Sequence, residues 1–372
     1  MVDFYDLSIA VAILAVLEIG GILLSIDAVM RPRSSQAAIA WSVSLISLPI
    51  VTIPLYLIFG RTRFEGYSEA LREKEILVEE ALTSWYAGMA ATAARGQDDL
   101  EALENLVRGL TDVPFTAGNE VGLLVDAERT YDQMLAAIAE ATSYVIIQFY
   151  IVKDGEIWRK FRETLIDRAR AGVKVYFLYD EIGSWQLSAA SLAELRAESI
   201  QVSGFKTTQG RRNRFQINFR NHRKLLVVDG HTGFIGGHNL ADEYFKYRDT
   251  HLLIRGPAAQ HIQLSFIKDW FWATRQLPEV NTDVRQPMSE PSSVAIVNTG
   301  PADNLANCSA LFATLCHTAK QRLWLTSPYF VPDDVMVRAL QSAAIRGVDV
   351  RLLLPGKADN IFVELASYTY YA

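Results

Sequence analysis

The chain has 372 residues, a formal net charge of −6 and 50% hydrophobic residues. This length allows two domains or one duplicated domain, and the mean hydropathy of +0.11 is high for a soluble enzyme, so we expect membrane segments. The two cysteines, Cys308 and Cys316, exclude a disulfide framework and a zinc site, and they agree with a reducing compartment.

Two apolar stretches open the chain. Ser8 to Ile26 is apolar except for Glu18 and two serines, and Ala37 to Phe59 has no charged residue over twenty-three positions. Both are long enough to span a bilayer. We predict a transmembrane hairpin over residues 1–63, with spans at about 8–26 and 37–59 and with kinks at Pro49 and Pro54.

The alternatives for the first stretch are a cleaved signal peptide and a buried core helix. Asp3 and Asp6 precede it without any Lys or Arg, which is the wrong charge for a signal peptide. Glu18 would be costly in lipid, so we expect it to face the second helix or a neighbouring chain, or to mark a weak span. Basic residues after the second stretch favour a cytoplasmic position for the rest of the chain.

Residues 64–118 are helical and acidic in character, and they predict a solvated linker. Globular order begins near Asn119. The patterns then predict helices at 130–141 and 156–171 and buried strands at 144–152 and 173–179. Strands that alternate with helices indicate an α/β fold with a mixed or parallel sheet flanked by helices.

Residues 221–239 read NHRKLLVVDGHTGFIGGHN and predict a strand that ends in a turn at Asp-Gly. His222 and Lys224 are two positions apart, so on a strand they share a face. A neutral imidazole beside an ammonium suits attack on a phosphate diester. The glycine pair lets the backbone approach a ligand, and the asparagine can bond a phosphate oxygen or orient the histidine. If only His222 and Lys224 were present, they could be an exposed pair on an ordinary strand. That alternative does not explain the full set of candidate site residues, which is His222, Lys224, Asp229, Gly236, Gly237 and Asn239.

A basic stretch surrounds the start of this motif. Residues 205–228 contain no Asp or Glu, and such a patch attracts polyanions, either lipid headgroups or nucleic acid, unless it is an ordinary solvated loop. The predicted hairpin favours lipid. The basic residues are Lys206, Arg211, Arg212, Arg214, Arg220, Arg223 and Lys224.

The same order of elements returns near the C-terminus, with a strand at 323–331, a helix at 333–346 and a strand at 348–354. The clearest matching segments are RAGVKVYFLYD and IRGVDVRLLLP. We predict a first lobe over 119–290 and an incomplete second lobe over 291–372. Transferring the interval from Gly172 to His222 onto Gly347 places a second motif histidine at about position 397. We therefore expect a sequence truncated before that motif and inactive unless completed.

The spacing of His222, Lys224 and Asp229 resembles the HKD motif of the phospholipase D superfamily. The hairpin ending in PLYLIFGRTRFEGY, the pair FYIVKDG and SPYFVPDD, and the segments NTGPADN and RGVDVRLLLPGKADN make nearly the whole chain similar to bacterial cardiolipin synthases. The resemblance implies a phospholipase D-like mixed sheet and phosphatidyl transfer between two phosphatidylglycerol molecules with release of glycerol. One motif histidine would form a phosphohistidine and the other would protonate the leaving alcohol.

The resemblance also implies anionic phospholipids as partners, a bacterial inner-membrane location with more than one span, and no cofactor, metal or nucleic acid. It assigns Asp249 to contact the partner motif's histidine, although an ion pair with Arg248 or a neighbouring cation on a strand edge is an alternative. Asp229 belongs to the motif, but a turn-forming role suits it at least as well. We interpret His231 and His238 as packing or surface residues.

Two other functions stay open. A single motif cannot supply both nucleophile and general acid, so the chain could be a non-catalytic membrane fragment. It could also be a single-motif phosphodiesterase or nuclease that is completed by homodimerisation.

Overall fold

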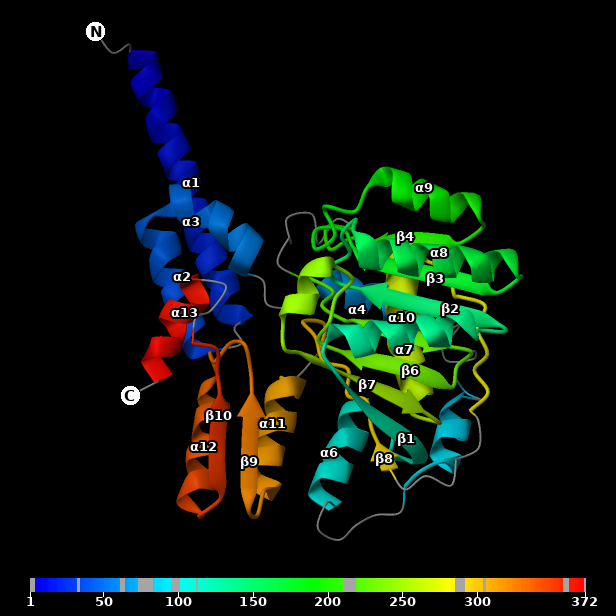
Figure 1. Cartoon of the computed structure of the whole chain (residues 1–372). Coiled ribbons are helices and arrows are strands. Elements are labelled where there is room, and N and C mark those ends of the chain that lie inside the picture. The colour runs from blue at the N-terminus through cyan, green and yellow to red at the C-terminus, as the bar shows by residue number, and fades with distance from the viewer. Residues whose placement is uncertain are drawn as a thin grey trace. The chain divides into compact units, whose positions relative to one another are not determined.

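The computed structural model describes residues 4–31, 34–60, 64–72, 83, 85–94, 101–111, 113–209, 219–284, 292–303, 306–356 and 361–370 (Figure 1). It divides into two compact units. Unit 1 lies within residues 1–81, 122–254 and 262–281, and unit 2 lies within residues 82–121, 255–261 and 282–372. The predicted linker 64–118 is therefore shared between the units.

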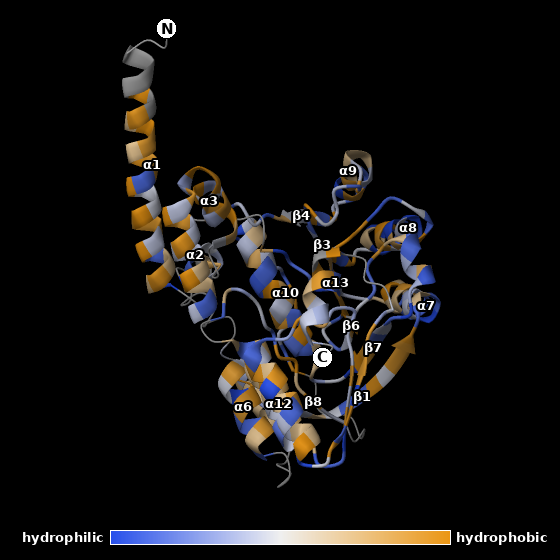
Figure 2. Cartoon of the chain, turned by 90° about the vertical axis from the view of Figure 1, so that its left-hand side faces the viewer, coloured by the Kyte–Doolittle hydropathy of each residue, from blue (hydrophilic) through white to orange (hydrophobic). Residues whose placement is uncertain are grey.

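The first apolar stretch forms one long helix, α1 (Phe4–Met30). Its segment Val11–Met30, with a mean hydropathy of 2.1, is the one helix among the described residues that is long and apolar enough to cross a membrane. Figure 2 shows hydrophobic residues along most of α1. Glu18 is exposed, which does not fit a position against the second helix and leaves the other two expectations, a neighbouring chain or a weak span, untested.

The second apolar stretch is interrupted. The helix α2 (Ser35–Ser47) ends before Leu48, the short α3 (Pro49–Leu55) starts anew, and the π-helical turn η1 (Tyr56–Gly60) follows. Leu48, with φ −143° and ψ 60°, lies outside the helical region, as residues before proline usually do. The bend predicted at Pro49 is thus a complete break, so none of the described helices in the second stretch is by itself long enough to cross a membrane.

Close backbone contact joins α1 to the second stretch. A Cβ atom at Gly21 would lie 2.4 Å from the carbonyl oxygen of Leu45, so only glycine permits this approach. The hydroxyl of Tyr56 donates to Asp27 Oδ2 at 3.0 Å. Ala28, Leu45 and Tyr56 form the buried centre of this small cluster.

We expect Gly21→Ala to destabilise the packing of α1 by about 1–3 kcal/mol, because the added methyl group must displace backbone. Gly20→Ala is the matched control, since its Cβ would lie 3.5 Å from Ile53 Cδ1, an ordinary contact. Thermal unfolding in detergent, followed through a cysteine cross-link between α1 and α2, measures both. Equal loss in the two variants would contradict the close approach.

The helix α4 (Glu65–Arg72) corrects the predicted linker. Phe64, Tyr67 and Ala70 are buried, and the ring of Phe64 lies 5.1 Å from that of Trp272 and 5.2 Å from that of Phe219. This segment is part of the core of unit 1 and is not a solvated connection. Sequence patterns missed it because its apolar residues are few and widely spaced.

Unit 1 contains a mixed sheet, as predicted. The parallel strands β2, β3 and β4 are followed on the other side of β2 by antiparallel β5 and β6, and then by β7 and β1. Their bounds are β1 (Thr116–Val125), β2 (Tyr144–Phe149), β3 (Lys174–Asp180), β4 (Gln201–Phe205), β5 (Leu225–Val228), β6 (Thr232–Gly236) and β7 (Thr250–Arg255).

Helices cover both faces of this sheet, which is why β2 is buried along its whole length. Val145, Ile147 and Phe149 belong to the core formed with α7 (Ala127–Ala139), α8 (Glu156–Arg170) and α9 (Ala189–Ala197). The alternate residues Tyr144 and Gln148 bond to Gln263 and Asp269 of α10 (Ala259–Thr274). A 3₁₀ helix, η4 (Asp242–Lys246), connects β6 to β7.

Unit 2 contains the first half of β1, which pairs with β8 (Ser292–Val294), and the parallel strands β9 (Arg322–Thr326) and β10 (Asp349–Leu353). Cys316, Ala339 and Leu340 form the centre of a small core. The helices described in unit 2 include α6 (Glu101–Thr111), α11 (Asn307–Thr318), α12 (Asp334–Ile345), α13 (Ile361–Ser367) and the 3₁₀ turn η5 (Tyr368–Tyr370).

The predicted repeat is visible in the backbone. Gly172 and Gly347 both have left-handed φ values, 91° and 87°, after α8 and α12. Each is followed by a valine whose N–H returns to a helix carbonyl, Val173 to Arg168 and Val348 to Ala343. Each then leads into a strand that is parallel to the strand before the helix. The two segments are therefore the same structural unit used twice.

Candidate active site

Two motif residues, His222 and Lys224, lie at one end of the sheet of unit 1. Leu225 of β5 pairs with Gln148 of β2 in antiparallel register, so the residues before β5 lie beside those that follow β2. His222 and Lys224 precede β5, whereas the sequence predicted them inside the strand. They still lie together, because Lys224 Nζ donates to the carbonyl oxygen of His222 at 2.7 Å.

Tyr150 joins these two side chains. Its ring stacks on the His222 imidazole with centroids 3.9 Å apart and planes 25° apart, and Lys224 Nζ lies 5.4 Å from the Tyr150 centroid. This tyrosine is not among the site residues that the sequence motif predicts. The available signal was its recurrence as Tyr329 in the matched segments FYIVKDG and SPYFVPDD.

The surroundings favour a neutral imidazole. Partial burial and then the Lys224 ammonium lower the pKa of His222 below its ordinary value, although Asp180 opposes them. Burial also lowers the pKa of Lys224 to about 8, although Asp249 opposes that shift. At neutral pH the site therefore holds a neutral ring beside a charged ammonium.

A buried carboxylate fixes the start of the motif. Asp180, at the end of β3, accepts the backbone N–H of Asn221 at 3.1 Å and the Arg220 guanidinium at 3.3 Å. It also accepts the N–H groups of Ile182 and Gly183. The main chain on the N-terminal side of His222 is thus tied to the end of β3.

Asp229 does not lie with the other motif residues. It follows β5 at the end opposite His222, where its carboxylate accepts four hydrogen bonds of 2.8–2.9 Å from Thr142, Ser143 and Tyr144. Burial raises the pKa of Asp229, but these hydrogen bonds outweigh it and hold the pKa below the ordinary value. With φ values of 50° and 71°, Asp229 and Gly230 form the turn into β6. This geometry corrects the catalytic assignment in favour of the structural one.

The space beside Gly236 and Gly237 is filled by other residues of the protein and not by a ligand. A Cβ at Gly236 would lie 2.5 Å from His251 Cα, and one at Gly237 would lie 2.1 Å from Asp249 Oδ1. The N–H of Gly237 donates to the carbonyl of Thr250 at 3.0 Å. The predicted close approach is therefore real, but β7 and the residue before it occupy the space.

Asn239 is buried, and its side chain is used within the protein. Its Oδ1 accepts the N–H of Ile151 at 2.9 Å, and its amide group donates to the Tyr244 hydroxyl. It therefore supports the loop that follows Tyr150 and does not present its amide to a phosphate. The neighbouring His238 is fully buried and stacks on His251, as the packing interpretation predicts.

Asp249 lies against Gly237 of the motif, and its negative charge opposes the lowering of the pKa of Lys224. Its carboxylate accepts the N–H of Thr250 at 2.7 Å. The Arg248 guanidinium instead contacts the carboxylate of Asp126 and the main-chain carbonyl of Asp249. These contacts therefore do not support the alternative of an ion pair between the Asp249 carboxylate and the Arg248 guanidinium.

Part of the predicted basic stretch, with Arg211, Arg212 and Arg214, lies outside the described residues. Within the described part of the chain, no group of three or more His, Cys, Asp or Glu side chains is placed to hold a metal ion.

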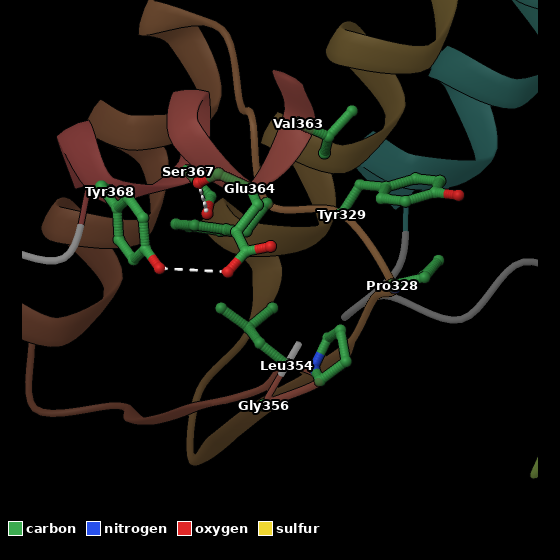
Figure 3. A pocket seen from close by; sticks show the side chains of 10 residues that line it. Pro328, Tyr329, Leu354, Gly356, Val363, Glu364, Ser367 and Tyr368 are labelled. Carbon is green, nitrogen blue, oxygen red and sulfur yellow. Dashed lines mark hydrogen bonds between the residues drawn. The ribbon is translucent and has the colours of Figure 1, made fainter. Parts of the chain in front are cut away.

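Unit 2 has a small pocket of about 70 Å³ where the ends of β9 and β10 meet α13. Figure 3 shows Tyr329, Leu354 and Glu364 among its lining residues, with the Tyr368 hydroxyl donating to the Glu364 carboxylate at 3.1 Å. Tyr329, which lines this pocket, corresponds to Tyr150 in the repeated segments.

The comparisons with known proteins agree with this arrangement. A family model described as "Cardiolipin synthase, PLD-like domain" matches residues 134–270 and 313–372, and one described as "Phospholipase D-nuclease N-terminal" matches residues 21–61. A protein named cardiolipin synthase A from Pseudomonas aeruginosa is 42% identical over 364 residues, which cover 95% of this chain and 74% of the relative. Its counterpart from Pseudomonas fluorescens is 39% identical over 381 residues, covering 99% and 78%.

A solved structure, phosphatidylserine synthase of Haemophilus influenzae, covers 72% of this chain and 71% of its own at 13% identity and a TM-score of 0.49.

The mixed sheet and its His-x-Lys site, with the matching family model, define a phospholipase D-type protein. The chain belongs to the bacterial cardiolipin synthase family, which consists of phosphatidyltransferases. The resemblance stated from the sequence is confirmed.

Proposed function

We propose that the protein transfers a phosphatidyl group from one phosphatidylglycerol molecule to another, with His222 as one of two catalytic histidines. The observation that carries this proposal is the position of His222, whose imidazole stacks on Tyr150 and whose carbonyl oxygen accepts from Lys224 Nζ. Burial and the Lys224 charge lower the pKa of this imidazole, which favours its neutral form. The ring supplies a nucleophilic nitrogen or a proton-transfer group, and the ammonium binds the non-bridging phosphate oxygens.

The reaction has two displacements. A histidine ring nitrogen attacks phosphorus, so that a P–N bond forms and the bond to the glycerol oxygen breaks, and a second histidine gives that oxygen its proton. A hydroxyl of the second phosphatidylglycerol then attacks the phosphohistidine, gives up its proton to that second histidine and releases the ring. Asp249 is proposed to orient the second histidine, which a motif in the second lobe would supply.

The proposal also covers the membrane. The apolar α1 and the small cluster that it forms with α2, α3 and η1 support a hairpin anchor. The basic residues that follow the second apolar stretch favour a cytoplasmic position for the body of the protein. Anionic phospholipids would then be both substrate and surroundings. A cysteine at Thr142, near the exposed turn of Asp229, should be labelled by a membrane-impermeant maleimide only after inner-membrane vesicles are opened or inverted.

The test is an assay of the full-length enzyme in phosphatidylglycerol vesicles, with a single-stranded DNA substrate in parallel. We expect a diphosphatidyl product and free glycerol in equal amounts, and no DNA cleavage. DNA cleavage without lipid transfer would support the nuclease alternative. No activity on either substrate would support the non-catalytic alternative.

The rate should depend on pH in a bell shape. It should rise as pH increases through the pKa of His222, below 6.5, because an attacking ring must be neutral. It should fall at higher pH as the proton-donating second histidine loses its proton, and fall further above about 8 as Lys224 does. Lys224→Arg should move the alkaline limb upward, since arginine stays charged. Measuring kcat/KM from pH 4.5 to 9.5 checks both limbs, and an alkaline limb unchanged in Lys224→Arg would contradict this assignment. His251 and His261, with pKa values of about 3 and 4, are neutral throughout and do not contribute.

A further inference from the structure

Behind the motif, a second buried carboxylate collects hydrogen bonds from three parts of unit 1. Asp269 of α10 is fully buried. Four side chains donate to it: Tyr67 at 2.8 Å, Gln148 at 2.9 Å, Asn221 at 2.8 Å and Arg223 at 2.7 Å. A buried charge is expensive unless it is paired and hydrogen-bonded, and this one is both.

Two of these donors flank the catalytic histidine. Asn221 and Arg223 stand on either side of His222, and the Arg223 N–H also donates to Asn221 Oδ1 at 3.2 Å. Gln148 completes the group by donating to the same Asn221 oxygen at 2.8 Å. Arg223 is therefore held away from substrate, because its guanidinium nitrogen Nη1 contacts both oxygens of Asp269.

The remaining donor comes from a distant part of the sequence. Tyr67 lies in α4, the first described helix after the apolar segments, and its ring packs against Trp272 at 5.7 Å. Its hydroxyl therefore connects the segment that follows the membrane helices to the carboxylate behind the motif.

We propose that Asp269 is a positioning residue for His222 and that Tyr67 couples α4 to it, an inference that rests on the proposed function. Asp269 touches no reacting atom in this arrangement. It holds the side chains of the residues on both sides of the histidine, while Asp180 holds the Asn221 backbone N–H from the end of β3. The ring of His222 is then presented to phosphorus in one orientation, and an error of about 1 Å there can cost about a hundredfold in rate.

The test compares Tyr67→Phe with Tyr144→Phe in the full-length enzyme. Both substitutions remove one buried hydroxyl, since Tyr144 donates to Gln263 at 2.7 Å at the end of β2 remote from His222. We expect similar losses of thermal stability. Only Tyr67→Phe should lower kcat for phosphatidylglycerol vesicles, by about three- to tenfold, with KM within twofold of the wild type.

Asp269→Asn should lower kcat about ten- to a hundredfold. Asp269→Glu should have a lower kcat than Tyr67→Phe, because the longer side chain displaces Asn221 and Arg223. The His222 ring resonances, assigned by NMR with His222→Asn, should shift in Tyr67→Phe and not in Tyr144→Phe. If Asp269→Asn does not fold, the two tyrosine variants decide alone. Equal kcat values and equal His222 spectra in those two variants would overturn the inference. A wild-type enzyme without transferase activity but with the expected spectral difference would instead refute the proposed function alone.

Discussion

His222→Asn in the full-length enzyme is expected to lower the rate of phosphatidyl transfer by about 10³-fold or more, because asparagine has neither a nucleophilic nitrogen nor a titratable one. Substrate binding should change much less, since Lys224 remains in place to bind phosphate oxygens. The measurement is the initial rate of diphosphatidyl product formed from radiolabelled phosphatidylglycerol. Protein-bound label that survives alkali and is released by acid would identify a phosphohistidine.

His231→Asn is the matched control for this variant. His231 lies in the turn after Asp229, at the opposite end of β5, and its Nδ1 contacts only the nearby Asp229 carbonyl at 3.2 Å among its hydrogen bonds. Its rate should stay within twofold of the wild type. A His222→Asn enzyme that forms product normally would remove this histidine from the mechanism.

The second large effect is on stability. Asp229→Asn should destabilise unit 1 by about 2–4 kcal/mol, because the amide keeps one acceptor oxygen and turns its NH2 group toward the N–H donors of Thr142, Ser143 and Tyr144. Asparagine tolerates the left-handed backbone at this position, so the loss reports the hydrogen bonds and not strain. Chemical denaturation measures it, with activity per folded molecule expected to remain within about threefold.

Exposed Asp132 on α7 provides the comparison, since Asp132→Asn should change stability by less than about 0.5 kcal/mol. Acidification gives a second check. The pKa of Asp229 is lowered by folding, so its contribution is complete above the ordinary value of 3.8 and is lost as pH falls through the lower folded value. Loss of activity without loss of stability in Asp229→Asn would return this residue to the reacting centre.

Regular patterns in the sequence predicted much of the fold. Helix and strand periodicity identified β2, α8 and β3, and the strand-turn signal identified the turn at Asp229. These elements are governed by local preference and by burial on both faces, which a linear pattern records. The repeat was found for the same reason, because glycine at a left-handed position leaves a distinct mark in the sequence.

The predictions that failed depend on contacts between distant segments. Nothing local in GRTRFEGYSEAL indicates that Phe64 and Tyr67 are buried against residues about two hundred positions later. Gly237 was correctly recognised as a place of close approach, but only the register of β7 decides that Asp249 fills the space. Asp229 was joined to His222 by the motif, although the length of β5 separates them.

The repeated strand-helix-strand segments, β2-α8-β3 and β9-α12-β10, bear on how the chain folds during its synthesis. In each copy the paired strands are separated by one short helix, so the unit closes on itself without waiting for a remote partner. Contacts of short sequence separation form fast, and domains fold in order of their synthesis. The β2-α8-β3 segment can therefore be formed on the ribosome before Leu225 is translated, and β5 then pairs with the existing edge of β2 and brings His222 and Lys224 to it.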